Sequence, residues 1–241
     1  MRVVTFIFLI CLLFSIPVSA QSEASRIFFK QGLQKAEIRD YETALSLFTR
    51  SLKFADSENF NESRTFLSQI HYNLGVCYYQ LNQQLKATEE FAIAIDLSNK
   101  KYQKAYYALG MAEAELKNWE KAQTAFYQSI RLNQQDGEAW FDLAMVFIAQ
   151  KDYENAQKSF WQSVKYNSVS KSAGYNNIGV ISALMGNFQS AEKEFKLALF
   201  ESDGKLIVAE SNLRFCRLYT KSNGANLLST LKFSNKNKSE N

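Results

Sequence analysis

Residues 118–130 read NWEKAQTAFYQSI, and residues 152–164 read DYENAQKSFWQSV. Both stretches have an aromatic residue second, an alanine fifth, a phenylalanine four residues after the alanine and a serine three residues further on. Spacings of three and four residues place side chains on one face of an α-helix. The two stretches therefore predict two helices built in the same way.

The alanine, the phenylalanine four residues after it, and an alanine or serine three residues further on occur together five times along the chain. The other copies are DYETALSLFTRSL from Asp40, QLKATEEFAIAI from Gln84 and NFQSAEKEFKLAL from Asn187. Their anchoring alanines, 43, 35, 34 and 35 residues apart, are Ala44, Ala87, Ala122, Ala156 and Ala191. Twelve residues before each alanine stands a small residue: Gly32, Gly75, Gly110, Ala144 and Gly179. A repeat of this length predicts helix pairs that stack to bury their apolar faces.

Side-chain size explains the pattern within one repeat. We expect the alanine and the small residue to lie where two antiparallel helices cross, because only small side chains let the backbones approach. The phenylalanine is expected to fill the gap between one repeat and the next. The only proline is Pro17, so from residue 18 on the sequence favours helix throughout.

These residues resemble the tetratricopeptide repeat, a 34-residue pattern with an aromatic, Leu-Gly, an aromatic, Ala, Phe and Ala at these offsets. Its Leu-Gly positions are taken by Leu74-Gly75, Leu109-Gly110, Leu143-Ala144 and Ile178-Gly179. The resemblance implies an all-α, right-handed α-solenoid of antiparallel helix pairs over residues 21–220. Its five repeats would span about 25–58, 68–101, 103–136, 137–170 and 172–205, followed by a capping helix at about 205–220. The chain departs from the pattern in lacking the proline that ends each repeat.

The two ends of the chain have different compositions. Residues 1–20 combine Arg2, an apolar run and Val18-Ser19-Ala20, which predicts a signal peptide cleaved after Ala20. An uncleaved membrane anchor is the alternative. Cleavage would give an exported protein, periplasmic or secreted, without stable membrane insertion, since no 18-residue apolar run follows. The polar tail, residues 221–241, is expected to be disordered.

The sequence offers little for catalysis or metal binding. Its net charge is +4 with both signs interspersed, so no basic cluster indicates a nucleic-acid partner. The single histidine, His71, is interpreted as a core ring with one hydrogen bond, and Cys77 and Cys216 as packing residues. We expect no metal, no cofactor and no enzymatic activity. Asn61 and Asn237 begin glycosylation acceptor triplets, which matter only in a eukaryotic secretory route.

The stretch YNLGVCYYQL, residues 72–81, has two apolar stripes when placed on a helix. One stripe is Leu74, Gly75 and Tyr78, and the other begins at Tyr72. In tetratricopeptide folds the second stripe lines a concave groove. By this resemblance the predicted groove residues are Phe29, Leu33, Tyr72, Val76, Tyr79, Tyr107, Met111, Phe141, Met145, Ile148, Asn176 and Val180.

The composition of the second stripe indicates what the groove binds. Family members that clamp a C-terminal carboxylate place Lys and Asn there, whereas this chain has aromatic residues, Met and Val, with Asn73 and Asn177 beside the stripe. An apolar groove suits an extended apolar segment or an amphipathic helix of another protein. The sequence thus predicts a non-catalytic interaction scaffold. The alternatives are a substrate-holding chaperone, an enzyme-accessory subunit, a homo-oligomer, or a groove filled by the chain's own N- or C-terminal segment.

Overall fold

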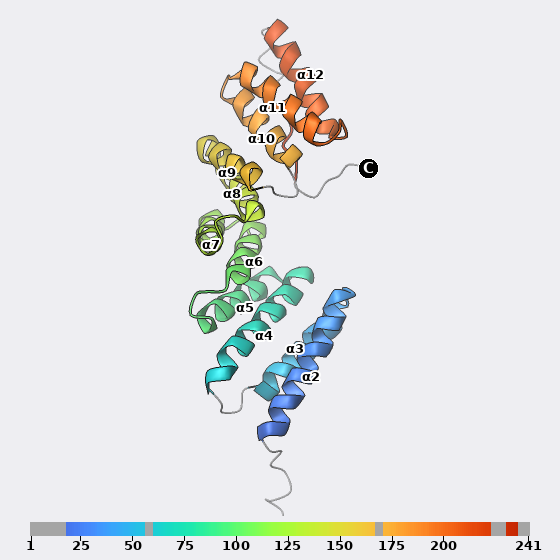
Figure 1. Ribbon diagram of the computed structural model, residues 1–241, viewed down its shortest axis with the longest axis vertical. Coiled ribbons are helices and arrows are strands. Elements are labelled where there is room, and N and C mark those ends of the chain that lie inside the picture. Colours follow the sequence, from blue (N-terminus) through green and yellow to red (C-terminus); the bar gives the residue numbers. More distant parts are fainter. Residues whose placement is uncertain (1–17, 56–59, 167–170, 223–229, 236–241) are drawn as a thin grey trace, which may run out of the picture. The chain divides into compact units, whose positions relative to one another are not determined.

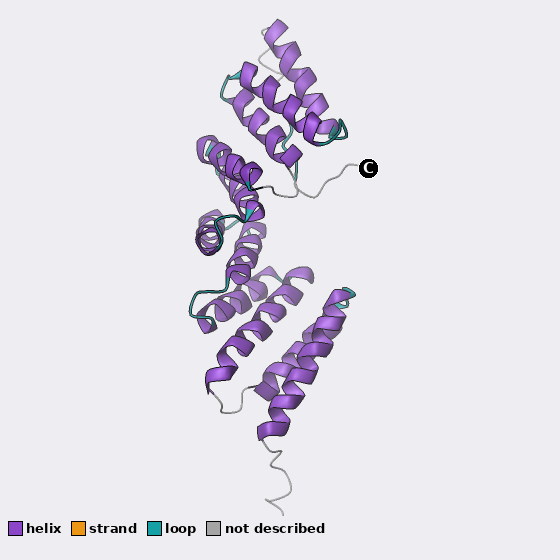
Figure 2. Cartoon of the chain, viewed as in Figure 1, coloured by secondary structure: helices purple, strands orange, loops and turns teal. Residues whose placement is uncertain are grey.

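The computed structural model describes residues 18–55, 60–166, 171–222 and 230–235, and in these residues all regular secondary structure except a short 3₁₀ turn is α-helix (Figures 1 and 2). The helices are α2 (Val18–Glu37), α3 (Tyr41–Ala55), α4 (Phe60–Gln80), α5 (Gln84–Leu97), α6 (Gln103–Glu115), α7 (Trp119–Leu132), α8 (Gly137–Ala149), α9 (Tyr153–Lys165), α10 (Lys171–Leu184), α11 (Phe188–Glu201) and α12 (Ile207–Ser222). The predicted all-α fold is confirmed. Residues 1–17 of the predicted signal peptide, and Asn237, lie outside the described residues, and cleavage after Ala20 stays a prediction.

Consecutive helices pack as antiparallel pairs, as the repeat pattern predicts. Near the start of α2 the Ser25 hydroxyl donates to the Ser51 carbonyl near the end of α3, at 2.8 Å. Further along α2, Gly32 instead meets Phe48, which precedes Ser51 in α3. The pair α4 and α5 repeats the first contact, with the Ser68 hydroxyl donating to the Ala94 carbonyl at 2.8 Å. The two helices of each of these pairs therefore run in opposite directions.

The glycines of the repeat lie against the phenylalanines of their own helix pair. A Cβ atom added to Gly75 would lie 2.6 Å from the Phe91 ring, and one on Gly179 would lie 2.7 Å from the Phe195 ring. The sequence analysis expected the phenylalanine between repeats, and Phe48 does pack with Ile70 of the next helix pair. The ring also needs the glycine of its own pair, because a side chain there would collide with it.

The turn inside each helix pair has the same conformation in all five repeats. One residue, five before the anchoring alanine, has a positive φ of 50–90°: Arg39, Asn82, Lys117, Lys151 and Gly186. The following residue's N–H donates to a carbonyl five residues back, for example Asn118 to Glu113 at 2.9 Å. This bond is typical of a Schellman ending, where glycine is the preferred residue. Only the fifth repeat has glycine there.

Replacing Lys117 with glycine should therefore stabilise the protein. A left-handed backbone costs a non-glycine residue about 1–2 kcal/mol, and glycine avoids this cost. Glycine also raises the entropy of the unfolded chain, which offsets part of the benefit, so we expect a net gain in stability of about 0.5–1 kcal/mol. Urea unfolding measures the change. The matched control is Lys193→Gly in the middle of α11, which should lose about 0.8–1 kcal/mol. Equal losses in both variants would contradict the shared turn.

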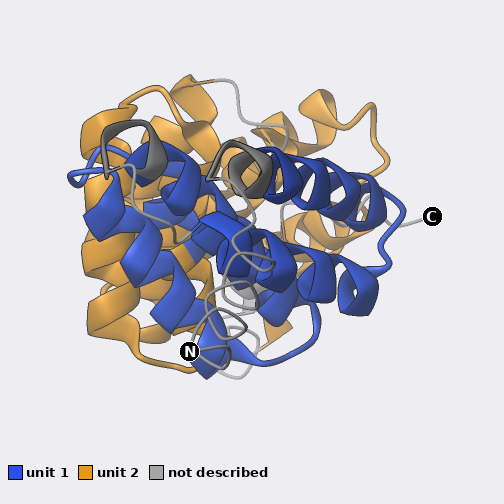
Figure 3. Ribbon diagram, turned by 90° about the horizontal axis from the view of Figure 1, so that it is seen from below, with its two compact units in different colours: residues 1–108 blue, residues 109–241 orange. Residues whose placement is uncertain are grey.

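The chain divides into two compact units, and each is described by itself (Figure 3). The first unit is residues 1–108 and the second is residues 109–241, so the division falls within α6. A core cluster of the first unit includes Phe48, Leu74 and Cys77. None of the described helices is long and apolar enough to cross a membrane. The proposed limits of the repeats and of the solenoid stay predictions.

The tail differs from the expectation of disorder over six of its residues. Residues 230–235, here named the C-terminal segment, form hydrogen bonds with α10 and α12 of the second unit. Figure 2 draws this segment as a loop that runs beside α10.

Candidate functional site

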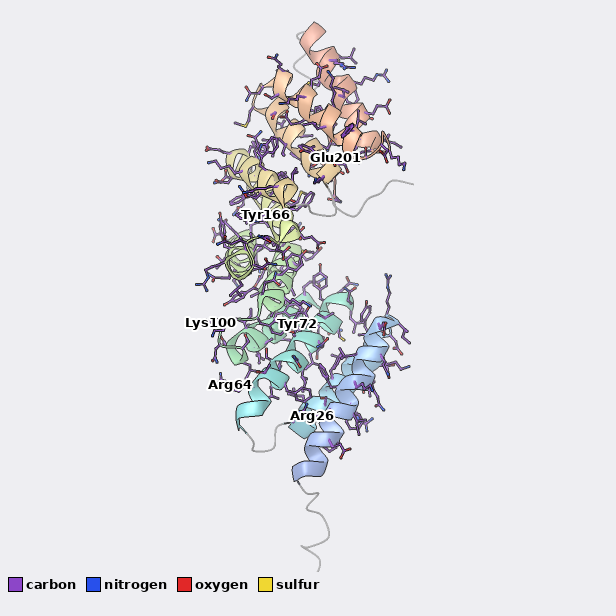
Figure 4. All side chains as sticks on the ribbon, in the orientation of Figure 1. Arg26, Arg64, Tyr72, Lys100, Tyr166 and Glu201 are labelled. Atoms are coloured by element: carbon purple, nitrogen blue, oxygen red, sulfur yellow. The ribbon has the colours of Figure 1, made fainter. Side chains whose placement is uncertain are left out.

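In the first unit Leu33 is exposed, at 42%, and the other predicted groove residues are half-buried. Their rings also pack within the stack of helices. The centroids of the Phe29 and Phe66 rings lie 5.2 Å apart, and those of the Tyr72 and Tyr102 rings lie 5.0 Å apart. Tyr72 is labelled on α4 in Figure 4. Phe29 and Tyr72 of the second stripe are therefore partly exposed and also pack against neighbouring rings. Val76, Tyr79 and Tyr107 are half-buried in the same way.

In the second unit the predicted groove residues fall into two groups. Met111, Met145 and Ile148 are half-buried, whereas Phe141, Asn176 and Val180 are fully buried. Phe141 was expected in the groove but belongs to the core, because its ring packs edge-on against Phe160 at 5.0 Å. Asn176 is buried beside the C-terminal segment, to which its amide donates a hydrogen bond. Val180 belongs to a core cluster with Phe195 and Leu213.

The C-terminal segment packs two apolar side chains on the second unit. Leu231 and Phe233 lie against a cluster that includes Val180, Leu213 and Cys216. The segment also contacts a predicted groove residue directly, because the Asn176 amide donates to the Lys232 carbonyl. The chain's own tail therefore lies against this part of the second stripe.

Asparagine side chains hold the main chain of the segment. The Asn177 Oδ1 atom accepts the N–H of Ser234 at 2.6 Å, and the Asn177 amide donates to the Ser234 carbonyl at 2.9 Å. Asn212 makes the same two bonds to Lys232, accepting its N–H at 3.0 Å and donating to its carbonyl at 2.8 Å. Two asparagines thus each pair with one residue of the segment, and those two residues are two positions apart. Such spacing is that of an extended chain.

A third asparagine links the other two. The Asn176 amide donates to the Lys232 carbonyl at 3.1 Å and to Asn177 Oδ1 at 3.2 Å, while its own Oδ1 accepts from Asn212 at 2.8 Å. The remaining amide hydrogen of Asn177 reaches the Met145 sulfur at 3.9 Å. Every side-chain amide hydrogen of the three therefore has an acceptor, as buried amides require. Asn176, Asn177 and Asn212 are named the asparagine site.

The sequence analysis missed Asn212 and set Asn177 aside. A signal was present in the sequence. Asn73 and Asn177 stand directly before the Leu-Gly position of a repeat, and Asn212 stands directly before Leu213-Arg214, the corresponding pair in the capping helix. Position alone does not decide the role, however. Asn73 donates instead to the Gln69 carbonyl of its own helix at 2.7 Å.

His71 is half-buried, and Cys77 and Cys216 are buried. His71 Nδ1 lies 2.6 Å from a carboxylate oxygen of Glu90, which is the single hydrogen bond expected of a core ring. Cys77 and Cys216 are free and buried, in agreement with their interpretation as packing residues. Within the described residues no group of His, Cys, Asp and Glu side chains could hold a metal ion.

Burial of Cys77 predicts a loss of stability at alkaline pH. Burial raises the pKa of this thiol from 9.0 to about 12. The native thiol therefore stays protonated while the unfolded thiol ionises, so its contribution is complete below pH 9 and declines as the pH rises from 9 towards 12. At pH 10 the loss from this group should be about 1.4 kcal/mol. Urea unfolding at pH 8 and 10 measures it, and Cys77→Ala should show a smaller decline. Equal declines would contradict the assignment.

Comparisons with known proteins agree with the repeat. Residues 107–160 match the model of the tetratricopeptide repeat family. No curated protein has a significantly similar sequence.

Solved structures share the fold of a larger part of the chain. A crystal structure of MamA is 24% identical and has a TM-score of 0.64, with 72% of this chain and 95% of that chain covered. Residues 41 to the end of MamA from Desulfovibrio magneticus RS-1 are 12% identical, with a TM-score of 0.66 and coverage of 76% and 97%. YrrB, described as a TPR protein with an unusual peptide-binding site, is 19% identical, with a TM-score of 0.58 and coverage of 71% and 83%. At these identities the likeness concerns the fold.

Proposed function

We propose that this helical-repeat protein is a non-catalytic scaffold that binds an extended peptide segment of another protein. In the second unit the proposed binding surface is that unit's part of the second stripe together with the asparagine site. In the first unit it is the second stripe alone. The proposal includes export, so that the partner is met in the periplasm or outside the cell. The residues that motivate export are Arg2, the apolar run after it and Val18-Ser19-Ala20.

The observation that carries the proposal is the pairing of Asn177 and Asn212 with main-chain groups. Each asparagine takes both the N–H and the carbonyl of one residue in an extended segment. Main-chain hydrogen bonds give affinity for an extended peptide, and pockets for its alternate side chains give selectivity. The second unit contains both parts of this mode of binding, because Leu231 and Phe233 occupy the apolar part.

Two further observations support the same function. Leu33, Met111 and Ile148 keep part of their apolar surface exposed in a helical-repeat fold, and such surface often marks an interaction site. YrrB, whose fold is similar, is described as having a peptide-binding site. A chaperone or an enzyme-accessory subunit would use the same surface but would differ in the number of its partners.

The test is capture of a partner from the exported fraction by the wild-type protein and by Tyr107→Ser/Met111→Ser. We expect one stoichiometric partner for the wild type and at least a thirtyfold weaker interaction for the variant, since loss of an interface anchor costs about 2 kcal/mol or more. Helical content and melting temperature should change little, because both side chains are half-buried. A collection of unrelated unfolded proteins would favour a holding chaperone. Full capture by the folded variant would exclude the stripe.

A further inference from the structure

We propose that the C-terminal segment is a displaceable internal ligand, and that the asparagine site accepts in its place an extended peptide with apolar side chains at two alternate positions. This inference rests on the proposed function and adds to it the chemistry of the ligand and a built-in competitor. The ligand is a short extended segment of four residues. An apolar residue comes first, then any residue with a free N–H, then a second apolar residue, and last a small residue with a free N–H.

The hydrogen bonds between the asparagine site and the C-terminal segment involve main-chain groups of the segment. Lys232 and Ser234 are held through their N–H and carbonyl groups, which any residue except proline also carries. The Lys232 side chain is exposed. Leu231 and Phe233 contribute packed apolar side chains, and Ser234 is buried, so its position requires a small residue. A peptide from another protein with the same alternation would reproduce each of these contacts.

Water can hydrate the three asparagine side chains when the segment leaves. Asn176, Asn177 and Asn212 are at most 1% exposed in the occupied state, and all of their amide hydrogens are paired. Opening would transfer these amides to water, which replaces their hydrogen bonds at little cost. Apolar residues would stabilise a permanent internal contact more than asparagines do. A buried amide costs free energy unless its hydrogen-bond partners stay in place. Three adjacent asparagines are therefore suited to an exchangeable ligand.

The C-terminal segment competes with external peptides as a ligand that is covalently tethered to the site. Seven residues of sequence separate Ser222, the end of α12, from Thr230. A ligand tethered by a short connection acts at an effective concentration in the millimolar range. Any external peptide with the same contacts must compete with that concentration. We therefore expect the full-length protein to bind such a peptide at least tenfold more weakly than a chain that lacks residues 230–241.

The experiment uses the full chain and a chain that ends at Ser229. The probe is a fluorescent hexapeptide of sequence TLKFSN with blocked ends, and binding is followed by fluorescence anisotropy up to millimolar protein. We expect saturable binding to the shortened chain and binding at least tenfold weaker to the full chain. Two control peptides separate the contributions: one is N-methylated at the residues matching Lys232 and Ser234, and the other carries aspartate at the position matching Phe233. Both should bind at least tenfold more weakly than the unmodified peptide.

Several outcomes would overturn the inference. One is a folded shortened chain that fails to bind the peptide, and another is equal binding to both chains. If the shortened chain does not fold, the full chain with Leu231→Ser and Phe233→Ser takes its place, and unchanged peptide binding there has the same meaning. A dimer in sedimentation that dissociates on removal of residues 230–241 would assign the segment to a second copy instead.

Failure of this inference is distinguishable from failure of the proposed function. Partner capture that depends on Tyr107 and Met111 would stand even if the hexapeptide did not bind. Conversely, hexapeptide binding would stand if the Tyr107→Ser/Met111→Ser variant captured its partner normally, because neither residue belongs to the asparagine site.

Discussion

Phe195→Ala should lower the free energy of unfolding by about 3–5 kcal/mol, the range observed when a buried aromatic side chain is truncated. Phe195 is fully buried in a cluster with Val180, Leu213 and Cys216. One edge of its ring lies against Gly179, so the backbone of α10 closes the space on that side. Because a helix backbone cannot easily move into the vacated volume, most of the cavity should persist. Urea unfolding followed by circular dichroism measures the loss.

Phe200→Ala on the same helix is the matched control. Its side chain is 78% exposed, so the change should stay within about 0.5 kcal/mol. A loss below 1 kcal/mol for Phe195→Ala, or losses of equal size for the two variants, would contradict the packing of α11 against α10.

Asn212→Asp should release the C-terminal segment while leaving the helices folded. The substitution keeps the shape of the side chain and retains an oxygen that accepts the Lys232 N–H. It replaces the amide that donates at 2.8 Å to both the Lys232 carbonyl and Asn176 Oδ1. A carboxylate oxygen would then face two other oxygens at a buried position, and breaking such contacts costs about 3 kcal/mol. Protection of the Lys232 and Ser234 amides from hydrogen exchange should fall about a hundredfold.

Asn73→Asp provides the control at the equivalent position of the second repeat. The Asn73 amide bonds only to the Gln69 carbonyl of its own helix and lies nearer the surface. Its replacement should change stability by less than about 1 kcal/mol and leave the C-terminal segment protected. Persistent protection of Ser234 in Asn212→Asp would show that the hydrogen bonds of this asparagine do not hold the segment.

The helix pairs could be predicted from the sequence because their determinants are local and repeated. Ala122, Phe126 and the glycine twelve residues before Ala122 recur with the same spacing in other repeats, and a spacing of three or four residues identifies one face of a helix. The turn conformation could not be read in the same way. Arg39, Asn82 and Gly186 share one left-handed backbone conformation although their side chains differ in size and charge.

The site could be predicted only in part. Two predicted groove residues of α10 lie near the C-terminal segment: Asn176 bonds to it, and Val180 belongs to the cluster that it packs against. Their role in binding a partner stays a prediction. Phe141 was misplaced because helices inside a stack are covered on more than one side, so a residue one position beyond the core face can still be buried. The asparagine site joins Asn177 and Asn212 to residues 57 and 20 positions further on. Contacts between distant residues leave no local periodicity, and two apolar residues in six do not identify a ligand.

Main-chain pairing at Lys232 and Ser234 also limits what the amino-acid alphabet can encode at these positions. Nineteen of the twenty residue types carry the N–H that the asparagines accept, and proline alone lacks it. The exposed position of Lys232 is therefore almost unconstrained in sequence, whereas the buried position of Ser234 is limited by size. Segments that occupy this site equally well can share little sequence beyond two apolar residues and one small residue. A search for ligands by sequence similarity to the tail would overlook them, whereas a search for two apolar residues in alternation with no proline between or after them would not.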